Sequence, residues 1–180
     1  MAVNIDALDS SFAGPIQQLL TDCANAGYRM VPTEGIRSPV EQSKLWRQSR
    51  SSAEVQAKIA ELRAKGYNFL AECIERAGPS NGEHVTNAIG GLSWHQWGEA
   101  VDCVWVMTNG RENWSVDELE NGQNGYRVYA QKAEELGLNA GGHWHSLKDW
   151  PHVQLRADGS PLTNLSMQEI NDTMLDRFGP

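Results

Sequence analysis

The chain has 180 residues, which suffices for one compact domain with a sizeable core and is short for two. Hydrophobic residues make up 40% of it and charged residues 21%, a balance typical of folded rather than disordered proteins. The formal net charge of -8 argues against nucleic acid or an anionic membrane as the partner, because both are bound through clustered Lys and Arg. We therefore expect a single domain over residues 1–180 and no nucleic-acid partner.

The N-terminal twenty residues contain no basic region followed by an apolar segment, so they do not resemble a signal peptide. No stretch of the chain is apolar over the length that a bilayer requires. We expect synthesis in the cytoplasm without a signal peptide, no membrane anchor, and action outside the cytoplasm only after release.

The cysteines are three in number and widely spaced: Cys23, Cys73 and Cys103. An odd, scattered set is not typical of a disulfide framework or of a zinc-binding cluster. We expect all three to be reduced residues of the core.

The first half of the chain predicts mainly helices. Apolar positions at helical spacing indicate a helix over 11–26, and a short strand and loop follow over 28–38. Ser38 and Glu41 form the pattern of a capping box, which predicts a helix through Trp46. Beyond it we expect a helical insert at about 47–84, with ordinary amphipathic patterns that suit a packing role or a lid.

The second half mixes strands and helices. We expect a buried strand over 101–107, a helix over 126–138 and a short strand over 152–155. A capping pattern predicts a C-terminal helix at about 166–177. Helices and strands without a regular βαβ alternation favour the α+β class.

Two short segments combine His with Asp among tryptophans: SWHQWGEAVDCV at 93–104 and DWPH at 149–152. Burying a lone carboxylate in a strand costs free energy unless a positive or hydrogen-bonding group lies next to it. Asp102 is therefore a candidate functional residue. His95 and Asp102 would lie about 23 Å apart on a straight strand, so the chain must fold back between them. Gly98 permits that turn, after which Asp102 faces a site and the alternate side chains Val101, Cys103 and Trp105 face the core.

His95, Asp102 and His152 together offer two imidazoles and one carboxylate, the ligand set of a catalytic zinc site. Asp149 would then be left as the general base for the water at the fourth position. The pair in HWH offers a rival assignment, because His143 and His145 lie on one face if extended and could replace His95 or Asp102. Spacing alone leaves both assignments open.

The segments GIRSPVEQSKLW, VTNAIGGLSWHQWGEAVDCV and GGHWHSLKDWPHVQL resemble the VanY-like D-alanyl-D-alanine carboxypeptidases and L-alanyl-D-glutamate endopeptidases. This family of zinc peptidases includes phage endolysins. The resemblance implies the Hedgehog/DD-peptidase fold, a small antiparallel sheet with flanking helices around a central zinc site.

Carried over residue by residue, the resemblance implies zinc as the cofactor, bound by His95, Asp102 and His152, and Asp149 as the catalytic base. It also implies that Arg37 contacts the substrate carbonyl or carboxylate and steadies the oxyanion. Positions on the substrate side are Ser93, Gln42, Trp144 and His143, and Gln42 has a purely structural alternative. The chain departs from the family pattern at His143, where an acidic residue is usual, and at Ala140, where a tryptophan is expected.

We expect from this resemblance a monomeric zinc metallopeptidase that hydrolyses the peptidoglycan stem peptide. The Asp-x-Pro-His form favours an L-Ala-D-Glu endopeptidase, which would act on the cell wall in the periplasm as a phage endolysin. A D-Ala-D-Ala carboxypeptidase is the alternative within the enzyme class. A catalytically inactive, zinc-stabilised wall-binding module is the alternative outside it.

Overall fold

The structure is a computed structural model that describes residues 3–180. It divides into two compact units. The sheet unit holds the described residues up to Ile36 and Trp97–Ala157, and the helical unit holds Arg37–Gln96 and Asp158–Pro180. The units are described separately below, and the single-domain organisation stays a prediction.

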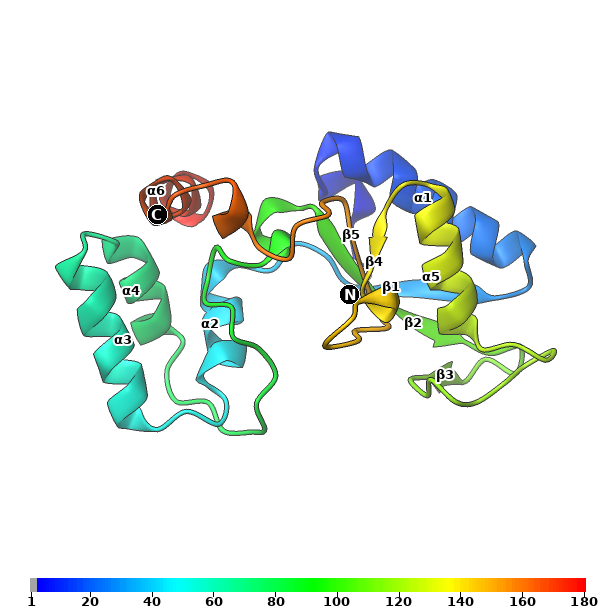
Figure 1. The fold of residues 1–180 in the computed structure, drawn as a ribbon, viewed down its shortest axis with the longest axis horizontal. Helices are drawn as coiled ribbons and strands as arrows, with labels where there is room; N and C mark the ends of the chain where they lie inside the picture. The colour runs from blue at the N-terminus through cyan, green and yellow to red at the C-terminus, as the bar shows by residue number, and fades with distance from the viewer. Residues whose placement is uncertain (1–2) are drawn as a thin grey trace. The chain divides into compact units, whose positions relative to one another are not determined.

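The sheet unit is built on a small antiparallel sheet with the strand order β1-β2-β5-β4, to which β3 adds by pairing with β2. The strands are β1 Arg29–Glu34, β2 Ala100–Val106, β3 Glu112–Asn113, β4 Asn139–Ala140 and β5 His152–Gln154. Its helices are α1 Ser10–Asn25 and α5 Gly125–Glu135, with the short turns η1 Ile5–Ala7 and η3 Gly141–His143 (Figure 1). This arrangement confirms the predicted α+β class with a small antiparallel sheet.

The core of the sheet unit lies between the sheet and its two helices. Val101, Cys103 and Trp105 are fully buried there, as the alternation along the strand predicts. The Tyr129 hydroxyl of α5 lies 3.2 Å from the Cys103 thiol, within hydrogen-bonding distance. Cys23, Cys73 and Cys103 are all free and buried, which confirms that they are reduced core residues.

The helical unit consists of α2 Pro39–Arg47, α3 Ser52–Ala64, α4 Asn68–Arg76 and α6 Met167–Phe178, with η2 Trp94–Trp97 at its border and η4 Pro161–Thr163. Capping boxes begin α2, α3 and α6, as the Ser-x-x-Glu patterns predict. The N-cap residue of α4 makes no side-chain cap. Asn171 of α6 caps it instead, because its Oδ1 accepts from the backbone N–H groups of Phe69 and Leu70.

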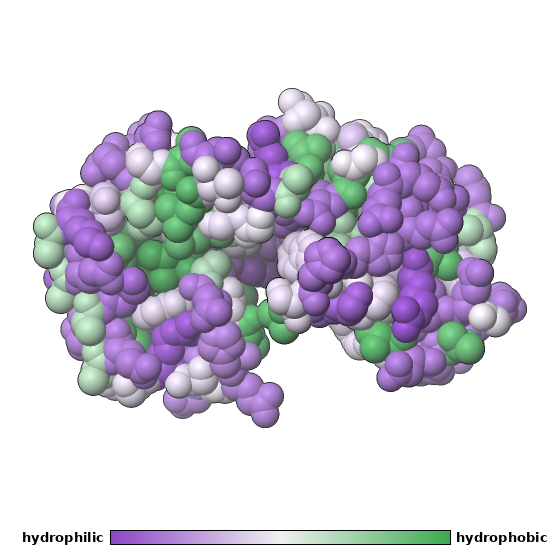
Figure 2. Space-filling view, viewed as in Figure 1, coloured by the Kyte–Doolittle hydropathy of each residue, from purple (hydrophilic) through white to green (hydrophobic). Residues whose placement is uncertain are grey.

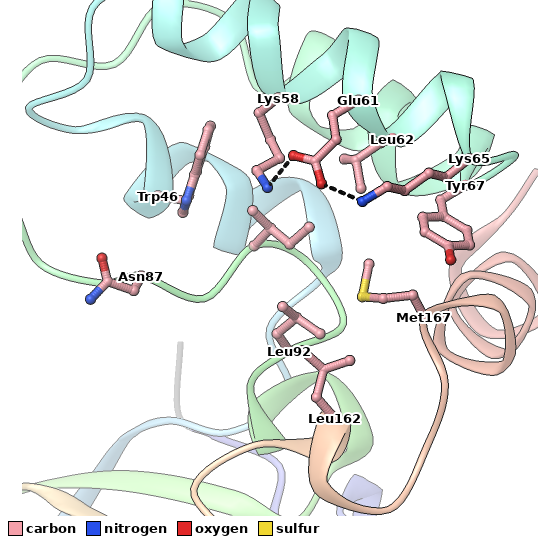
Figure 3. Close-up of a pocket in the computed structure, with 11 residues that line it drawn as sticks. Trp46, Lys58, Glu61, Leu62, Lys65, Tyr67, Asn87, Leu92, Leu162 and Met167 are labelled. Atoms are coloured by element: carbon pink, nitrogen blue, oxygen red, sulfur yellow. Dashed lines mark hydrogen bonds and ion pairs between the residues drawn. The ribbon is translucent and has the colours of Figure 1, made fainter.

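A cavity of about 220 Å³ lies inside the helical unit. Figure 3 shows Trp46 of α2 and Leu62 of α3 in its wall, with Leu92 and Leu162 opposite α3. Along α3, Glu61 binds the ammonium groups of Lys58 and Lys65 at 2.7 and 2.8 Å. These ion pairs lower the pKa of Glu61 to about 2.

The face of the molecule in Figure 2 is largely hydrophilic, in keeping with a mean hydropathy of -0.51. Large apolar side chains with substantial exposure include Val85, Trp114, Leu119 and Leu147. Within residues 3–180, no helix combines the length and the apolar character needed to cross a bilayer.

Candidate metal centre

The pairing of β2 with β5 places Asp102 directly opposite His152. Facing side chains of antiparallel neighbours lie close enough to interact, and here His152 Nδ1 is 2.9 Å from Asp102 Oδ1. His152 is buried, whereas Asp102 is half-buried. The carboxylate that looked out of place in an apolar strand therefore meets an imidazole across the sheet.

Gly98 forms the turn that the sequence requires between His95 and Asp102. Its φ of +74° lies in the left-handed region, where a side chain is strained. A Cβ atom there would also lie 3.0 Å from the backbone nitrogen of Asp9, which donates to the Gly98 carbonyl. His95 itself lies in η2, just before this turn, and its exposed fraction is 2%.

The structure brings His95, Asp102 and His152 together, with one ligand atom from each within 4.8 Å of the others. Two imidazoles and one carboxylate fit a catalytic zinc ion, which takes three protein ligands and keeps its fourth position for water. Within residues 3–180, His143 and His145 belong to no comparable group. His143 instead pairs with Glu134, its Nδ1 lying 2.6 Å from Oε1.

The surroundings of His152 act on the pKa of its imidazole in opposite directions. Burial acts to lower this pKa, but the hydrogen bond and charge of Asp102, the charge of Asp149 and the hydrogen bond of Gln154 together outweigh burial. The pKa of His152 is therefore raised above its ordinary value. A metal ion competes with a proton for the ring nitrogen, so metal affinity at this site depends on pH.

Gln154 is a buried neighbour of this site that the sequence analysis did not single out. Its Oε1 lies 3.1 Å from His152 Nε2, and its Nε2 donates to the Arg156 carbonyl at 2.6 Å. The second bond fixes the amide, so that Oε1 accepts from Nε2–H while Nδ1 faces Asp102. The i, i+2 spacing of His152 and Gln154 on a strand was the available signal.

Asp149 is held next to these residues by its backbone. Its N–H donates to the Gly141 carbonyl at 3.0 Å, and its carbonyl accepts from the His152 N–H at 3.2 Å. Pro151 connects the same segment to β2, because its carbonyl accepts from the Cys103 N–H at 3.0 Å. The residue as a whole is exposed.

The remaining predicted site residues fall into two groups. In the sheet unit, the Trp144 ring lies 5.2 Å from the His152 ring, and its Nε1 donates to Asn139. In the helical unit, Arg37 is buried and donates from Nη1 to Gln42 Oε1 at 2.8 Å. Gln42 is 1% exposed and bonded to protein groups, which fits the structural alternative for this residue.

The segment that carries the candidate ligands is similar to known proteins. Residues 86–155 match the model of a family described as D-alanyl-D-alanine carboxypeptidase. The peptidoglycan L-alanyl-D-glutamate endopeptidase CwlK of Bacillus subtilis is 30% identical over 134 residues, which are 73% of this chain. Both matches are to VanY-like peptidases, and the chain is similar to that family. The chain spans 64% of the length of CwlK.

Two solved structures are also similar to this chain. The L-Ala D-Glu endopeptidase ChiX of Serratia marcescens is 20% identical, with a TM-score of 0.45 over 85% of this chain and 84% of that one. The vancomycin resistance D,D-pentapeptidase VanY, solved in complex with Zn(II), is 21% identical. It aligns with a TM-score of 0.37 over 91% of this chain and 83% of that one.

Proposed function

We propose that the chain is a zinc peptidase that hydrolyses the bond between L-Ala and D-Glu in the peptidoglycan stem peptide. The observation that carries the proposal is the grouping of His95, Asp102 and His152, whose ligand atoms lie within 4.8 Å of one another. The likeness to CwlK, named as an L-alanyl-D-glutamate endopeptidase, favours this bond.

The roles of the residues follow from their chemistry. His95, Asp102 and His152 would hold the metal, and zinc bound there supplies a Lewis acid that polarises a carbonyl and lowers the pKa of a bound water to roughly 7. The Asp149 carboxylate takes the proton of the attacking water and delivers it to the leaving amine. The Arg37 guanidinium donates hydrogen bonds to the substrate carbonyl and stabilises the negative charge that develops on its oxygen.

Cleavage of the terminal D-Ala-D-Ala bond is the second candidate, because the matching family model carries the description of a D-alanyl-D-alanine carboxypeptidase. The two reactions give different products from the same muropeptides. Mass spectrometry would show a freed stem peptide for the endopeptidase and the loss of one terminal alanine for the carboxypeptidase.

The decisive experiment is digestion of purified peptidoglycan by the purified protein with and without a chelator. We expect hydrolysis that the chelator abolishes and zinc restores. Asp149→Ala should retain zinc and lose about 100- to 10,000-fold in rate, the range of general acid–base catalysis. Asp176→Ala, which removes an exposed carboxylate of α6, is the matched control and should keep full activity. Zinc binding without any hydrolysis would instead support an inactive wall-binding module.

The biological setting stays a prediction. We propose that the protein acts on the cell wall as a phage endolysin and is monomeric. Expression inside a bacterial host tests the first point, since an endolysin should lyse the culture when the inner membrane is permeabilised. Sedimentation of the purified protein tests the second.

A further inference from the structure

A pair of buried glutamines lies beside Arg37 in the helical unit. The exposed fractions of Gln42 and Gln96 are 1% and 0%. Gln42 Oε1 accepts from Arg37 Nη1 at 2.8 Å and from Gln96 Nε2 at 3.3 Å. Arg37 is thus bound by one amide that is itself bound by a second.

Backbone groups determine the orientation of both amides. Gln42 Nε2 donates to the Ala88 carbonyl at 2.9 Å, which turns its Oε1 toward Arg37. Gln96 Oε1 accepts from the Ser93 N–H at 3.1 Å, which turns its Nε2 toward Gln42. A carbonyl can only accept and an N–H can only donate, so neither amide can be flipped without breaking the chain of hydrogen bonds.

The same chain of bonds ties Arg37 to the segment that carries His95. The Arg37 N–H donates to the His95 carbonyl at 3.3 Å, while the guanidinium reaches this segment through Gln42 and Gln96. Ser93 completes the link, because its hydroxyl accepts from the His95 N–H at 3.4 Å. Both the backbone and the side chain of Arg37 are therefore fixed relative to η2.

We propose that Gln96, acting through Gln42, is a positioning residue that holds the Arg37 guanidinium in register with His95. The inference rests on the proposed function, in which Arg37 stabilises the developing oxyanion. A neutral amide suits this task because it fixes a cation by hydrogen bonding without adding a negative charge next to it. A carboxylate at position 42 would compete with the substrate for the guanidinium and would face the Ala88 carbonyl oxygen.

A double-mutant cycle tests the proposal. Gln96→Met keeps the shape of the side chain and removes the amide, so kcat/KM should fall about 10- to 100-fold, mainly through kcat, with zinc still bound. In an Arg37→Ala background the same change should have little further effect on kcat/KM, because the residue it positions is gone. Asn171→Leu, which removes another buried amide of the helical unit, is the control and should lower thermal stability while keeping kcat.

Equal losses from Gln96→Met in both backgrounds would overturn the proposal and indicate a general structural role. An unchanged kcat would overturn it as well. If the wild type cleaves no stem peptide, the proposed function fails, and NMR of ¹⁵N-labelled protein decides the positioning role separately. The Arg37 Nε–H signal, identified by its loss in Arg37→Ala, should broaden in Gln96→Met, and an unchanged signal would refute the inference.

Discussion

Gly141 is a position where one added methyl group should disturb the candidate metal centre. A Cβ atom built there overlaps the Asp149 carbonyl oxygen and lies 3.1 Å from the Asp149 Cβ. An ordinary contact requires about 3.4 Å or more, so Gly141→Ala must push the 149–152 segment away from η3. Because Asp149 bonds the backbone of both Gly141 and His152, the displacement reaches the proposed base and a proposed ligand together.

The expected magnitude follows from this overlap. Inserting a methyl group into a packed site costs about 1–3 kcal/mol of stability. A displacement of a catalytic group by about 1 Å costs on the order of 100-fold in rate, which corresponds to about 2.7 kcal/mol. We therefore expect Gly141→Ala to remain folded with a lowered melting temperature and to lose about 100-fold in kcat.

The assay compares melting temperature, bound zinc and muropeptide cleavage for two glycine variants. A Cβ atom at Gly159 meets nothing within 4 Å, so Gly159→Ala is the matched control and should behave as the wild type. Wild-type activity and stability in Gly141→Ala would show that residues 149–152 can move aside without cost. That result would refute the argument that Gly141 fixes the position of Asp149.

Three further outcomes are expected. His152→Ala should lose bound zinc, as measured by atomic absorption, and a variant that still binds stoichiometric zinc would exclude His152 as a ligand. Asn171→Leu should destabilise the protein by about 1–3 kcal/mol in urea unfolding, because two backbone N–H groups of α4 lose their acceptor; an unchanged midpoint would show that water replaces it. Hydrogen bonds from Ser38 hold the pKa of Glu41 below its ordinary value of 4.5, so its contribution to stability is present above that pH and is lost as pH falls through the lowered pKa. The stability difference between wild type and Glu41→Gln should shrink on acidification from pH 6, and a difference that grows would contradict the capping role.

Features fixed by nearby residues were predictable from the sequence. The capping boxes of α2 and α6 form as expected, because each depends on a serine and a glutamate three residues apart. Gly98 adopts the left-handed conformation that the spacing of His95 and Asp102 requires. The alternation along β2 also indicated correctly which side chains face the core.

Features that depend on distant partners were not predictable in the same way. β3 and β4 have two residues each, too few to show an alternating pattern. β3 pairs with the end of β2 that lies beyond β5, and β4 pairs with β5 on the side away from β2. The cap on α4 comes from Asn171, about a hundred residues away along the chain, so no local sequence motif predicts it. The division into two compact units likewise reflects contacts between segments that are far apart in the sequence.

Two glutamines that were not predicted from the sequence form hydrogen bonds beside the candidate site residues, and both are uncharged. Gln154 accepts from the imidazole of His152, and Gln96 supports the amide that binds Arg37. Each is oriented by a backbone group, and each forms its hydrogen bond without adding charge. A glutamate at position 154 would place a second carboxylate beside His152, where it could compete for the metal, and would face the Arg156 carbonyl oxygen. The amide at position 154 therefore leaves Asp102 as the only carboxylate in the group of proposed ligands that the described residues form.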